Sequence, residues 1–224
     1  PQDNVLRLPS EINTLEAVFI EPLSVVINAL EKILSFCDTH DSILAIIGCG
    51  TIGLLASQVA KIFEFKKIIA IDIIAEKVNL AQDLGANLGV SISSVTPPEN
   101  HFNQIQQFLK NEKIDVVMDC VGGEQSLDMA LKLVRKGGLI ELVGVPTEKC
   151  QVDLNRIILQ ERVVLGVYIY LRRHFYQGQE FIKNNKVKLI PLISKKIELN
   201  QINKAFNLIV QKKSQLIKVV LTNS

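Results

Sequence analysis

The sequence has no tryptophan, and aromatic residues make up only 5% of its 224 residues. It also lacks an excess of charge of one sign, because 25 lysines and arginines stand against 23 aspartates and glutamates. The formal net charge of +2, without a long basic run, gives no indication of a nucleic-acid partner. Since 48% of the residues are apolar, the core must consist of aliphatic side chains, which is typical of parallel strands buried on both faces.

Cysteines and histidines are too few and too scattered to indicate a local metal site. The four cysteines, at positions 37, 49, 120 and 150, contain no C-x-x-C pair, and the three histidines stand at positions 40, 101 and 174. We therefore expect reduced thiols that pack as small apolar side chains, as in a cytoplasmic protein. No signal peptide is recognisable, and the chain begins at Pro1 rather than at methionine, which indicates a processed or partial chain.

The stretch between Asp41 and Lys61 contains no charged residue, so hydropathy alone would permit a membrane span. Three glycines and several polar residues interrupt it, and the spacing of the apolar residues changes at the glycines. A strand followed by a helix explains this change better than one long helix does. We therefore expect no membrane partner.

A glycine-rich turn organises this stretch. The apolar run 43–47 leads into Gly48-Cys49-Gly50-Thr51-Ile52-Gly53, and a helical pattern follows. Strand, turn and helix stand in the order of the GxGxxG dinucleotide-binding fingerprint. Gly48 permits the sharp turn, Gly50 lets a pyrophosphate approach the backbone, and Gly53 lets the helix lie close to the sheet. The phosphates would face free N–H groups at the positive end of the helix dipole.

An acidic residue stands where the fingerprint requires one. The second apolar run, 67–71, ends at Asp72, which is 19 residues after Gly53. An acid at this position accepts hydrogen bonds from the adenosine ribose and repels a 2′-phosphate, so we expect NAD rather than NADP as the cofactor. Residues 73–76 contain no arginine that could bind such a phosphate. A packing turn beside a solvated aspartate would explain the glycines alone, but not the complete unit.

The remainder of the chain alternates between strand and helix patterns. Ser10 is a candidate cap for a first helix, and an apolar helix is expected at 25–34. The strands are expected at 43–47, 67–71, 89–93, 114–119, 139–143, 163–168 and 217–221. Helices are expected at 52–63, 75–84, 102–110, 125–134, 155–160, 175–184 and 199–211. This alternation predicts an α/β fold with a doubly wound, parallel, six-stranded sheet in the order 3-2-1-4-5-6, and a ligand across the carboxyl ends of its strands.

Several motifs stand in the order of one family. They are EPLSVV at 21–26, GCGTIG at 48–53, DVVMDCVGG at 115–123, KGGLIELVGVP at 136–146 and IKVVL at 217–221. With these motifs the whole chain resembles the medium-chain dehydrogenases, in particular the zinc-dependent alcohol and polyol (sorbitol-like) group, whose cofactor domain is a Rossmann fold. The resemblance also implies that a GroES-like lobe carrying the cysteine and histidine zinc ligands is missing, so the chain is expected to be truncated and inactive by itself.

The resemblance divides the chain into three parts. Residues 1–40 are expected to be a remnant of the catalytic domain with a connecting helix. Residues 41–169 are expected to form the dinucleotide-binding Rossmann domain. Residues 170–224 are expected to return to the catalytic domain.

The resemblance implies that NAD contacts the turn, the second strand and the last strand. The pyrophosphate would contact Gly48, Gly50, Thr51, Ile52 and Gly53. The adenosine ribose would bind Asp72, with Lys77 nearby. Cys120 and Val121 would line the cleft for adenine and ribose, and Lys218 would lie near the phosphates.

Four further positions are implied at the nicotinamide end of the cofactor. Val143 and Val145 would border the nicotinamide ring. Val167 and Ile169 would offer backbone groups to its carboxamide. Plain core packing explains a valine in such a strand equally well, so both interpretations stay open.

Glu21, in the EPLS motif, is the one candidate for a metal site. In the polyol dehydrogenases this glutamate lies at or beside the catalytic zinc, so Glu21 would bind or orient the metal only if the missing lobe supplied cysteine and histidine ligands. The alternative is a first-turn acid that the helix dipole favours. Asn28, in the following helix, stands where many relatives have a histidine.

For an intact protein, the resemblance implies reversible hydride transfer between NAD and a secondary alcohol, a polyol or a sugar, with zinc polarising the oxygen. The alternative is a non-catalytic NAD-binding module or scaffold subunit, and self-association into a homo-oligomer is compatible with either. A short-chain dehydrogenase is excluded, because no tyrosine is followed by a lysine four residues later. A methyltransferase could also use a glycine turn and a strand-end acid, but the third glycine and the C-terminal motifs favour the dehydrogenase.

Overall fold

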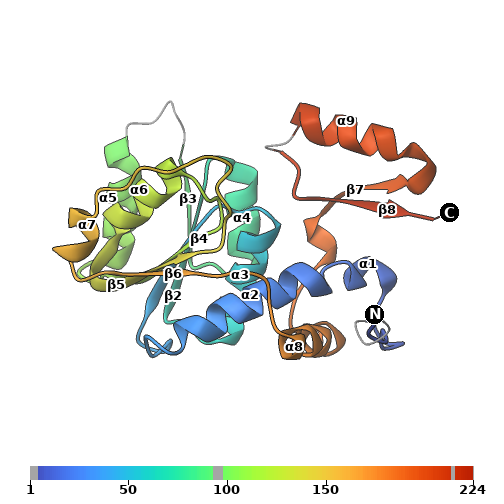
Figure 1. Ribbon diagram of the computed structural model, residues 1–224, viewed down its shortest axis with the longest axis horizontal. Helices are drawn as coiled ribbons and strands as arrows, with labels where there is room; N and C mark the ends of the chain where they lie inside the picture. The colour runs from blue at the N-terminus through green and yellow to red at the C-terminus, as the bar shows by residue number, and fades with distance from the viewer. Residues whose placement is uncertain (1–4, 93–97, 213–214, 224) are drawn as a thin grey trace.

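The computed structural model describes residues 5–92, 98–212 and 215–223. Its main sheet contains β1 (Ile43–Ile47), β2 (Lys67–Asp72), β3 (Leu88–Ser91), β4 (Ile114–Asp119), β5 (Val134–Leu142) and β6 (Val163–Gly166). The six strands are all parallel and lie in the order β3-β2-β1-β4-β5-β6 (Figure 1). The predicted fold class and strand order are confirmed.

Helices cover both faces of this sheet (Figure 1). Those that connect or flank its strands are α2 (Ile20–Ile33), α3 (Thr51–Ile62), α4 (Ala75–Leu84), α5 (Pro98–Leu109), α6 (Glu124–Leu133) and α7 (Asn155–Ile158). Within the described ranges, no helix is both long and apolar enough to cross a membrane.

Two apolar clusters, one on each face, form the core. In β1 every residue is buried, and successive side chains point to opposite faces. Leu44 and Ile46 pack with side chains of α2 and α3. Ile43, Ala45 and Ile47 pack with side chains of α5 and α6. Burial on both faces explains why this strand is a continuous apolar run rather than an alternating one.

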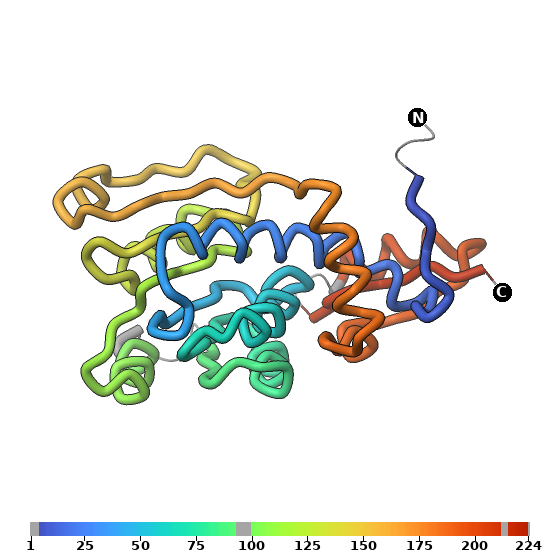
Figure 2. The backbone as a smooth tube through the Cα atoms, turned by 90° about the horizontal axis from the view of Figure 1, so that it is seen from below, coloured from blue at the N-terminus to red at the C-terminus, as the bar shows by residue number. Residues whose placement is uncertain are grey.

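The rest of the described chain forms a second, smaller group of elements. It contains α1 (Thr14–Ala17), α8 (Arg172–Lys183), η2 (Ile190–Leu192), β7 (Ile193–Glu198), η3 (Leu199–Gln201), α9 (Ile202–Lys212) and β8 (Lys218–Thr222). β7 and β8 pair in parallel as a separate two-stranded sheet beside α9. α8 packs across α2, so that segments far apart in the sequence are in contact (Figure 2). This packing connects the two groups.

Some predicted boundaries were wrong. α2 begins at Ile20 rather than at residue 25, because a proline in the first helical turn, here Pro22, removes no intrahelical hydrogen bond. Ser10 does not cap a helix. Instead Asn13 caps α1, and its Oδ1 accepts a hydrogen bond from the N–H of Leu15 at 2.8 Å.

Two strands also differ from the sequence prediction. β5 begins five residues earlier than expected, at Val134, and its pairing with β4 shifts register after Ile114. β7 was not predicted at all. The weak strand predicted at 89–93 corresponds to β3, and Ser93 lies outside the described residues.

Candidate functional site

The glycine turn lies between β1 and α3 at the carboxyl edge of the sheet. Gly48 has φ +93°, a conformation that favours glycine, and its N–H donates to the carbonyl of Ile71 at 2.7 Å. A Cβ on Gly53 would lie 1.8 Å from the carbonyl oxygen of Gly48. Helix and strand therefore approach so closely that only glycine fits at position 53.

Gly50 is different, because a Cβ there would meet no described atom within 4 Å. Gly50 is also the N-cap residue of α3, and no described side chain caps this helix end. The first N–H groups of a helix have no intrahelical partner, and the helix dipole makes this end positive. The turn therefore combines open space with backbone donors suited to an anion.

Asp72, the last residue of β2, binds the glycine turn. Its Oδ2 accepts a hydrogen bond from the N–H of Cys49 at 2.6 Å, and its Oδ1 accepts one from the N–H of Ile74 at 2.9 Å. The carboxylate thus fixes the turn to the end of the neighbouring strand. The sequence analysis had considered a ribose-binding or a solvated aspartate here, and it did not predict these two hydrogen bonds to the backbone.

A cleft of about 400 Å³ opens beside Asp72 at the carboxyl ends of the central strands. It is mostly apolar, and its lining residues are Ile47, Gly48, Ile71, Asp72, Ile73, Ile74, Lys77, Ile92, Val121, Gln125, Ser126 and Met129. Four of the predicted site residues, Gly48, Asp72, Lys77 and Val121, therefore lie together. A mostly apolar cleft with a few polar groups is typical of a site for a small molecule or a cofactor.

Asp119, the last residue of β4, is a residue that the sequence analysis missed. It is 1% exposed, and its Oδ1 accepts hydrogen bonds from the N–H groups of Val121 and Gly122 at 2.9 and 3.1 Å. Its Oδ2 accepts a hydrogen bond from the hydroxyl of Ser126 at 2.8 Å. Asp119 therefore shapes the second wall of the cleft. The available signal was an aspartate that ends a buried strand, as Asp72 does.

The two cysteines nearest the glycine turn and the end of β4 are Cys49, which is buried, and Cys120, which is partly buried. Burial raises the pKa of the Cys49 thiol to about 12, and the nearby charge of Asp72 adds to this shift. Burial also raises the pKa of Cys120 well above its usual value, and the charge of Asp119 acts in the same direction. Since only a thiolate reacts as a nucleophile, neither residue is suited to covalent catalysis near neutral pH.

We expect iodoacetamide to leave Cys49 unmodified at pH 7.5 under conditions in which the same cysteine is fully alkylated in urea-unfolded protein. The reason is the raised pKa together with complete burial of the side chain. Mass spectrometry of the peptide that contains Cys49 measures the modification. Equal alkylation rates in the folded and unfolded protein would contradict the expectation.

Other predicted cofactor residues lie outside this cleft. Thr51 and Ile52 begin α3, and the hydroxyl of Thr51 donates to the carbonyl of Ile217 at 3.0 Å, so this hydroxyl is already engaged. Cys120 and Val143 pack against the apolar cluster on the α2 side of the sheet. Val145 is 71% exposed beyond the end of β5.

Val167 and Ile169 follow the end of β6, farther along the same edge. Val167 is buried, and its N–H donates to the carbonyl of Leu142 at 3.0 Å, whereas Ile169 is exposed. The carbonyl of Val167 and the N–H of Ile169 make no hydrogen bond with any described residue. One free acceptor and one free donor therefore lie two residues apart at this edge.

Lys218 and Glu21 lie near each other where α2 begins. The Nζ atom of Lys218 is 5.3 Å from the ring centroid of Phe19. Burial lowers the pKa of Lys218, and the charge of Glu21 opposes that shift. Burial also raises the pKa of Tyr170, with a further contribution from Glu21.

The described residues alone do not form a zinc site. No three histidine, cysteine, aspartate or glutamate side chains among them gather in a group that could hold a metal ion. Glu21 is exposed, and its charge acts to raise the pKa values of Lys218 and Tyr170. We therefore derive no chemical step through a metal from these residues.

The sequence is similar to those of several known proteins. D-xylulose reductase of Saccharomyces cerevisiae is 28% identical over 92% of this chain and 57% of its own length. L-threonine 3-dehydrogenase of Bacillus velezensis is 31% identical over 99% of this chain and 62% of its own length. The chain thus spans about three fifths of the relatives that it matches.

A solved structure shares the fold. An alcohol dehydrogenase from Escherichia coli CFT073, determined with NADH, superposes with a TM-score of 0.85 over 99% of this chain and 63% of its own, at 23% identity. The family model described as "Zinc-binding dehydrogenase" matches residues 51–184, which begin in the glycine turn and end after α8. By this match, the chain belongs to the zinc-binding dehydrogenases, within the medium-chain dehydrogenase family whose motifs it carries.

Proposed function

We propose that this chain binds NAD(H) across the carboxyl edge of its main sheet, as the cofactor-binding part of an alcohol or polyol dehydrogenase. The observation that carries the proposal is the open space at Gly50, directly before the uncapped start of α3. A pyrophosphate placed there would receive backbone hydrogen bonds at the positive end of the helix. The turn therefore fits a pyrophosphate through its open space and its backbone N–H donors, without help from a side chain.

The adenosine end of the cofactor would occupy the cleft beside Asp72. The apolar lining, which includes Ile73 and Val121, would contact the faces of the adenine ring. The carboxylate of Asp72 would accept hydrogen bonds from the ribose hydroxyls while still holding the N–H of Cys49. Lys77 lines the same cleft and is 9% exposed.

The nicotinamide end would lie toward the strands β5 and β6. A primary carboxamide carries both a donor and an acceptor, and the free carbonyl of Val167 and the free N–H of Ile169 complement it. Val143 and Val145, which follow β5, would border the ring. These assignments place the whole dinucleotide along one edge of the sheet.

In a whole enzyme of this kind, the bound nicotinamide supplies the redox chemistry, while the protein orients it. The proposed reaction is hydride transfer between the nicotinamide and a secondary alcohol, a polyol or a sugar, which is the substrate class that the names of its polyol-dehydrogenase relatives indicate. We propose that residues 41–169 form the cofactor domain. In this proposal, residues 1–40 and 170–224 contact the part of the enzyme that holds the substrate.

A non-catalytic NAD-binding module is the second candidate. Residues 5–92, 98–212 and 215–223 contain no metal-holding cluster, so they are compatible with a module that binds NAD without catalysis. Both candidates require dinucleotide binding, and they differ in whether a zinc site on another part of the protein joins Glu21. A zinc content of one per chain in protein purified from its natural source would favour the dehydrogenase.

The Asp72→Ala variant tests the proposed cofactor site. We expect NADH to bind about tenfold more weakly, because hydrogen bonds from the ribose to a charged acceptor are lost. NADPH should bind as well as before or better, since the repulsive carboxylate is gone. Isothermal titration calorimetry with each nucleotide measures both effects.

The control is Asp83→Ala, which removes an exposed aspartate near the end of α4 and should leave both affinities unchanged. A thermal melt of each variant checks that it is folded at the assay temperature, because Asp72 also holds the turn. If the unchanged chain bound NADH and NADPH equally well, the role given to Asp72 would have no basis.

A further inference from the structure

Ile169 has a backbone conformation that needs support from its surroundings. Its φ is +56°, in the left-handed region, which a β-branched residue rarely adopts because its side chain crowds the backbone. Such residues persist only where neighbouring groups hold them, and they concentrate at functional sites. Ile169 follows β6 and carries the N–H group that we assign to the nicotinamide carboxamide.

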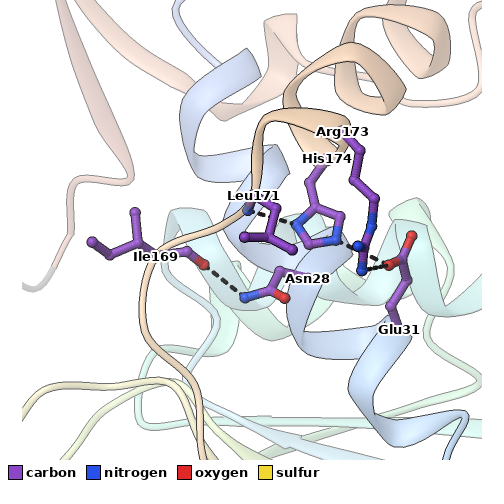
Figure 3. Close-up of polar contacts among 6 residues, drawn as sticks. All are labelled: Asn28, Glu31, Ile169, Leu171, Arg173 and His174. Carbon is purple, nitrogen blue, oxygen red and sulfur yellow. Dashed lines mark hydrogen bonds and ion pairs between the residues drawn. The ribbon is translucent and has the colours of Figure 1, made fainter.

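Asn28 of α2 holds this residue through its carbonyl. The Nδ2 group of Asn28 donates to the carbonyl oxygen of Ile169 at 2.9 Å (Figure 3). Asn28 is 7% exposed, and 141 residues separate the two partners in the sequence. Since the carbonyl of Ile169 is engaged by Asn28, its N–H is the group left for a ligand.

His174 of α8 holds the same segment two residues later. Its Nδ1 accepts a hydrogen bond from the N–H of Leu171 at 3.0 Å, so the proton of the neutral ring is on Nε2. Nε2 lies 2.9 Å from Oε2 of Glu31, to which it donates. His174 is fully buried, and the guanidinium of Arg173 also binds Glu31 at 3.2 Å (Figure 3).

The two helices that carry these side chains are packed against each other. α2 provides Asn28 and Glu31, and α8 provides His174. Gly178 of α8 faces the first turns of α2, where an added Cβ would be 3.5 Å from the carbonyl oxygen of Ile20. The backbone of residues 169–171 is therefore fixed from both helices, although neither helix contributes an atom to the cleft beside Asp72.

We propose that Asn28, Glu31 and His174 are positioning residues for the nicotinamide half of the dinucleotide. They hold residues 167–171 so that the carbonyl of Val167 and the N–H of Ile169 meet the carboxamide in one orientation. That orientation decides which face of the nicotinamide ring is turned toward the substrate. The inference rests on the proposed function, since it requires a dinucleotide along this edge.

The experiment compares NADH with ADP-ribose, which has the same adenosine and pyrophosphate but no nicotinamide. Calorimetric titration of the 224-residue chain with each compound isolates the part of the affinity that depends on the nicotinamide. For Asn28→Ala we expect about a tenfold loss of NADH affinity and an unchanged ADP-ribose affinity, because only the carboxamide contact is disturbed. The fluorescence change of the reduced nicotinamide on binding should also be lost.

Two substitutions of His174 separate positioning from packing. His174→Asn keeps an acceptor near the place of Nδ1 and should retain most of the NADH affinity. His174→Gln keeps a donor for Glu31 but loses the acceptor for the N–H of Leu171, so it should behave like Asn28→Ala. The matched control is Lys183→Ala, which removes the 3.2 Å ion pair of α8 with Glu11 and contacts no residue of the 167–171 segment.

Other results of these titrations would contradict the positioning role of Asn28, Glu31 and His174. Equal losses of NADH and ADP-ribose affinity in Asn28→Ala, or an unchanged NADH affinity, overturn the inference. If the unchanged chain binds ADP-ribose as tightly as NADH, the nicotinamide adds no affinity and the inference is overturned. The proposed site for the adenosine and pyrophosphate would still stand. An unchanged chain that binds neither compound overturns the proposed function itself.

Discussion

The Gly53→Ala variant will lose about 3 kcal/mol of unfolding free energy, which is the upper range for overpacking in a closed core. The added methyl carbon would lie 1.8 Å from the carbonyl oxygen of Gly48 and 2.9 Å from its carbonyl carbon. Both atoms belong to the backbone, so no side-chain rotation relieves the clash. The start of α3 would have to move away from the end of β1, and the buried residues that follow Gly53 in α3 would lose contacts with the sheet. Urea denaturation followed by circular dichroism measures the loss.

Gly50→Ala is the matched control, because it adds the same methyl group three residues earlier. Apart from the adjoining residues 49 and 51, no described residue has an atom within 4 Å of that position, and the φ of −76° suits alanine. We expect the unfolding free energy to change by less than about 1 kcal/mol, the cost of alanine at a helix N-cap. ADP-ribose should bind about tenfold more weakly, because the methyl group occupies the space proposed for the pyrophosphate. Equal stability losses in the two variants would contradict the geometry of the turn.

The Glu141→Met variant will be more stable than the unchanged chain by about 1–3 kcal/mol at pH 7.5, the cost of an unpartnered buried polar group. Glu141 lies in β5 and is completely buried, and both its carboxylate oxygens lack a hydrogen-bond partner among the described residues. Burial raises the pKa of this carboxyl well above its usual value, and the charge of Lys32 opposes the shift. Methionine has a similar length and carries no group that needs a partner.

The stability that Glu141→Met gains over the unchanged chain should depend on pH. Because burial raises the pKa of Glu141, the folded state holds this proton to a higher pH than the unfolded chain, which releases it near pH 4.5. The stability that depends on this group is therefore fully present below pH 4.5 and is lost as the pH rises toward the folded pKa. Urea denaturation at pH 4.5 and pH 7.5 measures the difference.

A second substitution isolates the ionisation. Glu141→Gln removes the titrating group but keeps a polar side chain without a partner, so it should gain stability over the unchanged chain at pH 7.5 and little at pH 4.5. Glu141→Met should be the more stable of the two variants at both values. A loss of stability in both variants at pH 7.5 would mean that the carboxylate has a stabilising partner outside the described residues, and it would contradict the prediction.

Local sequence signals were sufficient to predict the strand, glycine turn and helix at the centre of the fold. β1 and α4 have the predicted bounds, and the glycine turn and Asp72 lie where the fingerprint places them. These features depend on glycine conformations and on the spacing of apolar residues within about 20 positions. Such signals are present in a short stretch of sequence, whatever the rest of the chain does.

Features that depend on distant partners could not be predicted in the same way. β7 has two lysines in its six residues and pairs only with β8, whose first residue lies 25 positions after the start of β7. No apolar pattern indicates such a strand, because one face of a small two-stranded sheet is largely exposed. β7 forms because the backbone of β8 provides the hydrogen-bonding partner for it.

The sequence by itself determined the doubly wound sheet, its strand order and the turn that faces the proposed pyrophosphate. The periodicity of apolar residues and the residue types of turns are local signals, so they can be recognised in the sequence alone. Only the tertiary structure decided that Asn28 binds Ile169, that Glu31 binds His174, and that Glu141 has no hydrogen-bond partner among the described residues. The two contacts join residues more than 140 positions apart, and they exist because α2 and α8 pack against each other in the folded chain.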